Sequence, residues 1–576
     1  MNLFTRKNTG PRLLITALSS LILASFGTTS SSSSQLVNNI VSMAASNGYV
    51  EVADSPSCTV FSQELQDPPS VTAGADGQIT TQLTALPLDK CVNGYQVNVK
   101  SYSDSTAAPD SRPIGPAYIM RVGENLPPAT LNIGFTNALG PVNGSYDCMD
   151  HSSANIDQCT NLHTHGFHVS PKPGSDDVFL HLPPSNTVSD YQFALRPDHA
   201  PGTHWLHAHL HGSTSPQVKN GMAGALILKG ATDDWLASNF GVTGDRDKIM
   251  ILQQLSVETD ADGNDIPLCG NSAAGIPITN AINGQCLPNI TANEGDIHHW
   301  RLIQSGVFAT VNFRVEDVNG NRLDFIEYAR DGINMGSAIQ PSTNLVTLQP
   351  GYRSDILFQM PSRSAVCPQT TGECKIYLVD DASEAGDSLY GTPESHNLIA
   401  SVTINASSQT TPDMPDITNS TFDNPYKLIP DSELLTDSNG NFVTKKVYFA
   451  NEDNGDKTVN GQVFNASTPP LPLKLGTATL WNLWVSETQV NSSASHPFHI
   501  HVNPFQVTET LSNGQVINYW KDTLLVSGAK EGGNWKEENA ITVRSRYENF
   551  DGKFVLHCHN LDHEDAGMMM SVEISP

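Results

Sequence analysis

Short runs in which apolar and polar residues alternate recur along most of the chain. The runs YQVNVKSY at 95–102 and GALILKG at 224–230 are two examples, and Gly, Pro and Asn separate such runs from one another. Alternation of this kind is typical of antiparallel strands that bury one face, and stretches with helical periodicity are scarce. The pattern therefore predicts an all-β protein built from β-sandwiches.

The runs fall into three segments of similar size. The first segment covers 55–240, and the second, with runs such as KIMILQQLSVET, covers 241–410. A polar, Pro-containing stretch at 411–424 reads as a linker to the third segment, 425–576. Because a chain of 576 residues is too long for one hydrophobic core, we expect three β-sandwiches in series.

The N-terminus has the composition of a targeting sequence. Three basic residues precede an apolar run at 13–26, which is too short to span a bilayer comfortably. We interpret 1–27 as a signal peptide and 28–54 as a Ser-rich spacer, with an uncleaved N-terminal anchor as the alternative. An exported protein, periplasmic or extracellular, is therefore expected.

The net charge of the chain excludes some classes of binding partner. The chain has 59 Asp and Glu against 31 Lys and Arg, a formal net charge of -28. Such a surface repels phosphate backbones and anionic lipid headgroups. Neither nucleic acid nor a stable membrane partner is expected, and the sequence does not indicate an oligomeric state.

Nine cysteines also point to an oxidising compartment. Eight of them form four couples that are close in sequence and compatible with disulfides, although spacing leaves the connectivity open. The couples are Cys58 and Cys91, Cys148 and Cys159, Cys269 and Cys286, and Cys367 and Cys374. The cysteine left over, Cys558, is flanked by two histidines, and metal ligation is the best reason for an unpaired thiol there.

Histidines at alternate positions provide the strongest chemical signal. The motifs LHTHG, HWLHAHLHG, HPFHIH and HCHNLDHEDAGMMM each contain such a pair. Residues i and i+2 of a strand point to one face, so each pair offers two imidazoles to one cavity. A single pair is more typical of a solvated strand, and the inference depends on all four occurring together. The pairs are His163 and His165, His207 and His209, His499 and His501, and His557 and His559.

The last two motifs contain a second kind of metal site. A thiolate with two imidazoles and a weak axial thioether is the ligand set of a blue-copper electron-transfer site. Along a strand, the Cys558 side chain should point away from those of His557 and His559. The chain would then connect the blue site to a second metal cluster. The four ligands of the predicted blue site are His496, Cys558, His563 and Met568.

In this order and spacing, the four motifs resemble those of the three-domain multicopper oxidases, the family of laccases, bacterial spore-coat laccase and copper-efflux oxidases. The stretches GMAGALILKG, HHWRLIQSG and PGYRSDILF add to the resemblance, which covers nearly the whole mature chain. The resemblance implies three cupredoxin-like Greek-key sandwich domains in series. It also implies four copper ions, one type 1, one type 2 and two type 3.

Carried over position by position, the family implies a role for each ligand. The type 1 site is the blue site already described, and the trinuclear cluster would lie between the first and third domains. The middle domain, which carries no ligand motif, would act as a spacer. In the cluster, the type 2 copper would take His163 and His499, one type 3 copper His165, His207 and His559, and the other His209, His501 and His557.

The reaction implied is four one-electron oxidations of a small reducing substrate coupled to reduction of O2 to two waters. Met568, Met569 and Met570 form the only methionine cluster, so a Met-rich insert typical of copper-efflux members is absent from the sequence. We therefore favour phenolic or aromatic amine donors. The alternative is a metallo-oxidase for Cu(I), Fe(II) or Mn(II). A non-catalytic copper-binding or scaffold protein is a second alternative, and the complete ligand set argues against it.

Reduction of dioxygen also consumes protons, which a buried carboxyl group can deliver. Glu564, directly after His563, matches the acidic residue of the spore-coat laccase motif, where a proton-donating role is assigned. Asp176 or Asp177, downstream of the first motif, is the other candidate by rough alignment with the family. A surface turn would give the same Asp-Asp sequence.

Overall fold

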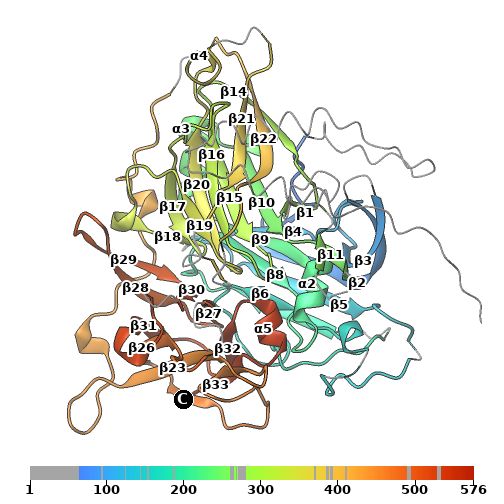
Figure 1. Cartoon of the computed structure of the whole chain (residues 1–576), viewed down its shortest axis with the longest axis vertical. Coiled ribbons are helices and arrows are strands. Elements are labelled where there is room, and N and C mark those ends of the chain that lie inside the picture. The colour runs from blue at the N-terminus through green and yellow to red at the C-terminus, as the bar shows by residue number, and fades with distance from the viewer. Residues whose placement is uncertain are drawn as a thin grey trace, which may run out of the picture.

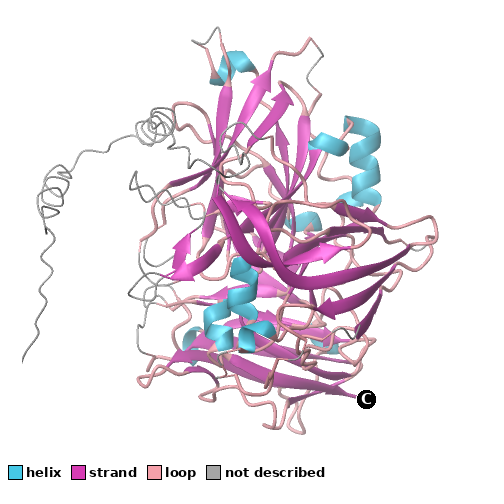
Figure 2. Cartoon of the chain, turned by 90° about the vertical axis from the view of Figure 1, so that its right-hand side faces the viewer, coloured by secondary structure: helices cyan, strands magenta, loops and turns pink. Residues whose placement is uncertain are grey.

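The computed structural model describes residues 64–576 with several gaps. The gaps are 93–94, 124, 143, 152, 154, 186–188, 260–264, 268, 270–279, 369–371, 384–387, 390–392, 409–411, 490–493 and 529–532. The predicted signal peptide, the spacer and Cys58 lie outside the described residues. Strands dominate and the helices are short (Figure 2), which confirms the all-β prediction. No helix in the described part of the chain is long and apolar enough to cross a membrane.

The first sandwich combines two sheets around one core. One sheet has the order β3 (Tyr95–Asp104), β2 (Gln78–Val92), β5 (Thr130–Asn137) and β7 (Ser189–Ala194). The other has the order β1 (Ser70–Thr72), β4 (Ala117–Arg121), β9 (Ala223–Lys229), β8 (Gly202–His207) and β6 (His163–His165). Buried residues of both sheets, such as Phe135 and Leu226, belong to the same hydrophobic cluster. Two histidine pairs, on β6 and at the end of β8, therefore lie at one edge of this sandwich.

The second sandwich is built in the same way. One sheet has the order β13 (Ala281–Ile282), β10 (Asp247–Gln253), β15 (Ile297–Gln304), β20 (Arg353–Gln359), β17 (Ile326–Arg330) and β18 (Ile333–Asn334). The facing sheet has the order β14 (Asn289–Asn293), β22 (Asn397–Asn405), β21 (Lys375–Asp380), β16 (Val311–Glu316) and β19 (Val346–Leu348). A separate two-stranded sheet pairs β11 (Ser256–Thr259) with β12 (Asp265–Pro267).

The third sandwich contains the C-terminal motifs. One sheet has the order β24 (Lys457–Val459), β23 (Thr444–Asn451), β26 (Thr477–Val485), β31 (Ile541–Tyr547), β28 (Phe505–Thr510) and β29 (Val516–Lys521). The other has the order β25 (Leu471–Lys474), β33 (Met569–Ser575), β32 (Gly552–Cys558), β27 (His496–Ile500) and β30 (Thr523–Val526). Strands β27 and β32 are neighbours, so the last two motifs lie side by side.

Every residue of β15 is buried, because its sheet is covered on both faces. Trp300 faces the core of the second sandwich, whereas Ile303 packs on the first sandwich beside Trp205 and Ile227. The strand has no exposed face, and its polar residues are buried with partners, as Arg301 is with Asp233 and Asp247. Figure 1 shows the result, with the second sandwich at the top, the first at the right and the third below.

Short helices connect the first and third sandwiches. The helices α2 (Thr214–Asn220) and α5 (Leu561–Asp565) contact each other, and Asp565 accepts hydrogen bonds from the main-chain N–H groups of Gly212, Thr214 and Ser215. These donors at the start of α2 have no partner within the helix, so a carboxylate there is favourable. The other α-helices among the described residues are α3 (Ala231–Phe240) and α4 (Arg363–Val366).

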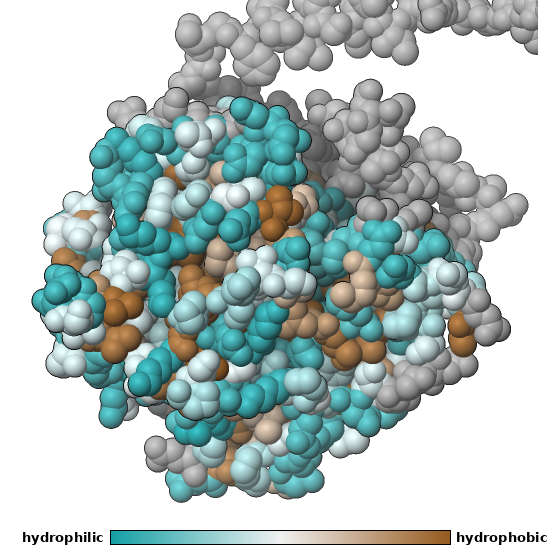
Figure 3. Space-filling view, turned by 90° about the horizontal axis from the view of Figure 1, so that it is seen from below, coloured by the Kyte–Doolittle hydropathy of each residue, from teal (hydrophilic) through white to brown (hydrophobic). Residues whose placement is uncertain are grey.

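Three of the four cysteine couples are disulfides in the structure. They are Cys148–Cys159, Cys269–Cys286 and Cys367–Cys374. Among the described residues, Cys558 is free and buried. Seen from below, over the strands that lie lowest in Figure 1, polar residues alternate with small apolar patches (Figure 3), as expected for a strongly acidic chain.

Candidate metal centre

Strand register places the histidines of the motifs opposite one another. His163 pairs with His207 across β6 and β8, and His499 pairs with His557 across β27 and β32. Phe498 pairs with Cys558 in the same ladder. Because successive side chains alternate between faces, His557 and Cys558 point to opposite sides of β32.

On one side of β32 lies a cluster of sulfur and nitrogen donors. The Cys558 Sγ atom is 3.6 Å from His496 Nδ1 and 3.8 Å from His563 Nδ1. Met568 is fully buried, and its main chain is hydrogen-bonded to both Cys558 and His563. His496 Nε2 lies 3.1 Å from Gln489 Oε1, which leaves Nδ1 free to face the sulfur. The structure thus brings all four predicted type 1 residues together.

On the other side, three imidazoles converge at one point. The Nε2 atoms of His209 and His557 are 3.2 Å apart, and His501 Nε2 lies 3.2 Å and 3.4 Å from them. Three neutral rings cannot satisfy one another by hydrogen bonds in this arrangement, whereas three nitrogen lone pairs aimed at one point suit a cation. These three histidines are one of the predicted type 3 sets.

The other predicted type 3 set also assembles. His559 Nε2 lies 3.2 Å from His165 Nδ1, and the donors of His165, His207 and His559 all lie within 4.8 Å of one another. The His207 ring lies 2.8 Å through Nδ1 from the Ala208 carbonyl oxygen, so its Nε2 is free. A contact of the second ring nitrogen with a carbonyl or carboxylate is the usual way in which a protein orients a metal-binding imidazole.

The two predicted type 2 residues lie between these sets. The His163 and His499 rings have centroids 6.1 Å apart, and each stacks on a neighbouring ligand ring, His163 on His501 and His499 on His165. The Nε2 atoms of His163, His207 and His499 are buried without a hydrogen-bond partner. Unpaired buried nitrogens are costly in a protein interior, and a bound cation would satisfy them.

Burial also sets the protonation of these groups. It lowers the pKa of His207 to about 3 and that of His209 to about 4, so both rings are neutral at pH 7. Burial, followed by the nearby Lys457, lowers the pKa of His563 to about 3. It raises the pKa of the Cys558 thiol, which a metal would deprotonate on binding. The donor set therefore has the chemistry of copper ligands.

Glu564 lies between two of the converging imidazoles. Its Oε2 is 3.1 Å from His557 Nδ1, and its Oε1 is 3.5 Å from His209 Nδ1. Thr214 of α2 donates a hydrogen bond to Oε1 at 3.1 Å. Burial raises the pKa of Glu564, but the imidazoles of His209 and His557 outweigh it, and the net pKa lies below its ordinary value. This ionised carboxylate orients both rings so that their Nε2 atoms face the same point.

The structure distinguishes the two aspartates that the sequence could not. Asp176 is buried, with Oδ2 2.9 Å from His163 Nδ1, and it accepts the Thr164 N–H at 2.8 Å. Burial raises the pKa of Asp176 to about 7. Asp177 is only half-buried and accepts the Phe179 N–H in a turn. Of the two candidates, Asp176 is the one that contacts a predicted ligand.

Sequence reasoning missed Asp522 and Arg353. The Asp522 Oδ1 atom lies 3.2 Å from His165 Nε2, and the Asp522 carbonyl oxygen lies 2.9 Å from His499 Nδ1. Arg353, on β20 of the second sandwich, makes two hydrogen bonds to the Asp522 carboxylate. The stretch WKDT, which contains Asp522, has no motif spacing that would have singled it out. The middle segment is therefore more than a spacer. Its Arg353 holds Asp522 in place, and Asp522 contacts two predicted ligands, His165 and His499.

Two models of the family known as multicopper oxidase match the chain, one over residues 151–233 and one over 434–576. These two matches contain all four histidine motifs. The chain belongs to the multicopper oxidase family. Members of this family are copper-dependent oxidoreductases that use O2, and this chain is such an enzyme.

The individual relatives have low sequence identity to this chain, but the matches extend over most of its length. A multicopper oxidase of Staphylococcus haemolyticus is 23% identical over 428 residues, 73% of this chain and 78% of that protein. A solved multicopper oxidase of Campylobacter jejuni, described as a metallo-oxidase, has a TM-score of 0.63 and 19% identity, and it covers 90% of this chain and 96% of its own. A laccase of Pediococcus acidilactici also has a TM-score of 0.63, with 18% identity, 92% of this chain and 97% of its own. These likenesses confirm the cupredoxin-like fold.

Proposed function

We propose that this multicopper oxidase is laccase-like and couples four one-electron oxidations of phenolic or aromatic amine donors to reduction of O2 to two waters. The observation that carries the proposal is that the side chains of three adjacent residues, His557, Cys558 and His559, point alternately to two different groups of potential metal ligands. His557 and His559 face histidines of the first sandwich, whereas Cys558, between them, faces His496 and His563. Two kinds of metal site are thereby joined through adjacent residues.

The proposal requires four copper ions. Bound copper would supply the one-electron chemistry at both sites. We assign the type 1 copper to His496, Cys558, His563 and Met568, the type 2 copper to His163 and His499, and the type 3 coppers to His165, His207 and His559 and to His209, His501 and His557. The unpartnered Nε2 atoms of His163, His207 and His499 support this assignment.

The other residues of the site fix the orientation of these ligands. Glu564 and Asp176 contact the Nδ1 atoms of rings whose Nε2 atoms face inward. Asp522 does the same for His165 through the opposite ring nitrogen. We propose that both carboxylates also relay protons to the site where water forms. Asp176, whose pKa burial raises to about 7, can hold a proton, whereas the ionised Glu564 can accept one and pass it on.

We propose that dioxygen and water pass at the junction of the first and third sandwiches, where two hollows share part of their lining. A hollow of about 710 Å³ is lined by Tyr426, Asn503, Pro504 and Trp520. A much smaller hollow, which shares Tyr426, Asn503 and Pro504 with the first, is also lined by His163 and His501. The two hollows support access for small molecules from this face to the type 2 side of the cluster.

A metallo-oxidase and a laccase resemble this fold equally well, so the choice of donor rests on the sequence. The absence of a Met-rich insert favours organic donors over Cu(I). Oxidation of Cu(I), Fe(II) or Mn(II) is the second candidate, which the description of the Campylobacter jejuni enzyme favours.

Oxygen uptake by copper-loaded protein tests both candidates. A phenol, Fe(II) and Cu(I) are supplied in parallel, and copper per chain is measured by elemental analysis. Four coppers with oxygen uptake on the phenol support the laccase-like function. Turnover with metal ions alone establishes the second candidate instead. One or two coppers without uptake on any donor would indicate a copper-binding protein.

A further inference from the structure

Three histidines that the copper centre does not use lie close together around one disulfide. The His151 and His211 rings have centroids 4.5 Å apart, and the His151 and His181 rings have centroids 6.3 Å apart. His151 is exposed, and the other two are half-buried. We propose that His151, His181 and His211 form a separate, exchangeable binding site for one divalent transition-metal ion such as Zn²⁺.

The 4.5 Å separation of the His151 and His211 rings suits two imidazoles bound to one ion, and the His181 ring lies 6.3 Å from that of His151. Zinc–nitrogen bonds of about 2.0–2.1 Å place the centroids of two rings on one ion roughly 5 Å apart. In the copper centre of this same chain, His209 and His501 are separated by 4.7 Å and His496 and His563 by 5.2 Å. The His151 ring is exposed, so rotation of its side chain between staggered rotamers can move it between its two neighbours.

The hydrogen bonds leave nitrogens free for an ion. His151 Nδ1 lies 2.8 Å from the His211 carbonyl oxygen, to which it can donate, so its Nε2 is available. Metal-binding histidines typically use their second nitrogen in this way. His211 Nδ1 is buried without a hydrogen-bond partner. Burial and the nearby His151 lower the pKa of His181, which keeps that imidazole neutral and able to bind an ion.

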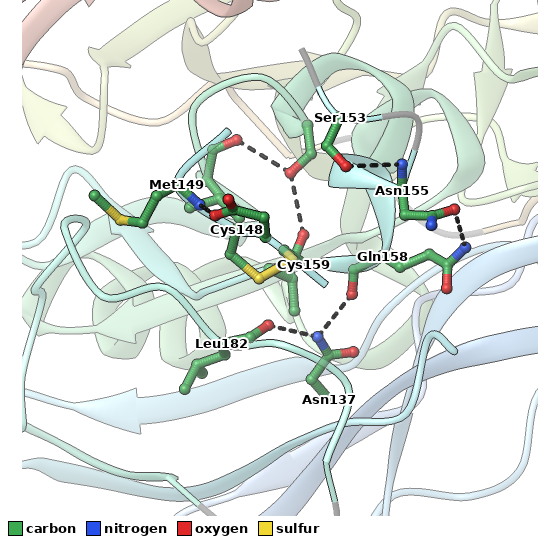
Figure 4. The surroundings of a disulfide bond; sticks show 12 residues. Asn137, Cys148, Met149, Ser153, Asn155, Gln158, Cys159 and Leu182 are labelled. Atoms are coloured by element: carbon green, nitrogen blue, oxygen red, sulfur yellow. Dashed lines mark hydrogen bonds between the residues drawn. A yellow bond between two sulfur atoms is a disulfide. The ribbon is translucent and has the colours of Figure 1, made fainter. Parts of the chain in front are cut away.

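The disulfide Cys148–Cys159 fixes the three positions relative to one another. His151 follows Cys148 by three residues in the loop that the disulfide closes. The main chain of Leu182, next to His181, makes two hydrogen bonds with Thr160, next to Cys159. Figure 4 shows the same Leu182 carbonyl accepting a hydrogen bond from Asn137 beside the disulfide. Leu210, next to His211, belongs to the same buried cluster as both cysteines. The site is therefore held by cross-linked backbone rather than by one mobile loop.

Zinc binding to the copper-loaded protein tests this inference, because Zn²⁺ is redox-silent and copper can be counted in the same sample. Titration calorimetry and elemental analysis should find one Zn²⁺ per chain with copper content unchanged. His151→Ala and His181→Ala should each weaken zinc binding more than about tenfold, since loss of even an outer partner of a ligand costs about that much. His168→Gln, a matched control whose ring contacts Val502 and Asn549, should leave it unchanged.

Two results would overturn the site. One is zinc binding that is no weaker in His151→Ala than in the parent protein, or absent up to about 1 mM Zn²⁺. The other is zinc uptake matched by loss of copper, which would place the ion in the copper centre. Melting temperatures of the variants, expected to equal that of the parent, check that the fold is intact. The result does not depend on oxidase activity, so it is independent of the proposed function.

Discussion

Arg353 of the second sandwich makes a two-point contact with Asp522 of the third, with Nη1 2.7 Å from Oδ1 and Nη2 2.5 Å from Oδ2. Both side chains are buried, and the same Oδ1 atom lies 3.2 Å from His165 Nε2. The guanidinium fork thereby fixes the carboxylate that orients a predicted type 3 ligand. Lysine cannot reproduce a two-point contact of this kind.

Arg353→Lys should therefore lower oxygen uptake about 10- to 100-fold, the usual cost of losing a partner that orients a metal ligand. Copper content and the electron paramagnetic resonance spectrum of the trinuclear centre should change as well. Arg301→Lys is the matched control, because Arg301 is equally buried and pairs with Asp233 and Asp247, neither of which contacts a predicted copper ligand. If the control loses as much activity and copper as Arg353→Lys, the effect is general destabilisation.

Cys558→Ser should remove one copper per chain and the intense blue absorption of a thiolate site. The histidine-only sets on the other side of β32 keep all their ligands, so the remaining copper should stay bound. Elemental analysis and visible absorption measure both effects. Complete loss of copper would show that the two sites do not assemble independently.

Asp176→Asn and Asp177→Asn form a pair of neighbouring substitutions with opposite expectations. Asp176 contacts the His163 ring and two groups of Thr164, so its replacement should slow oxygen uptake about 10- to 100-fold. Asp177 accepts a turn N–H, and asparagine can do the same, so its replacement should change uptake less than about twofold. Equal losses in both variants would contradict the assignment of Asp176 to the site.

Acid should destabilise the metal-free protein. The pKa of His207 falls from 6.5 to about 3 and that of His209 to about 4 on folding, so the unfolded chain binds more protons as pH drops below 6.5. Stability is then lost with falling pH from about 6.5 towards the folded-state values. Carboxyl groups whose pKa is raised by burial, such as Asp176 and Glu394 at about 7, act in the opposite direction, but the buried histidines with a lowered pKa outnumber them. Melting temperatures of chelator-treated protein at pH 7, 6 and 5 measure the trend, and a constant or rising value would refute it.

The predicted ligand residues could be picked out from the sequence because their signal is local. Alternation of His163 with His165, or of His557 with His559, follows from the two-residue period of a strand, and the structure brings both pairs to one cavity. Asp522 and Arg353 could not be found in this way, because their contact joins positions 169 residues apart. The same limit applied to Asp176 and Asp177, which differ only in which one is turned inward.

The complete burial of β15 shows a related limit. Its eight buried residues fit a strand, but sequence alone does not reveal that a neighbouring sandwich covers its second face. That cover consists of Trp205 and Ile227 of the first sandwich packed against Ile251 and Ile303 of the second. Contacts between sandwiches depend on side-chain shape at distant positions, which no periodicity records.

The pairing of His499 with His557 makes metal uptake a test of correct assembly. A slip of one residue between β27 and β32 would turn every donor on the slipped strand to the opposite face. Four of the eight paired histidines come from β6 and the end of β8, in the first sandwich. A chain whose first and third sandwiches have not docked therefore presents only part of each predicted set of ligands. Cupric ion should therefore bind in full only to molecules whose two ends have docked with β27 and β32 in the native register.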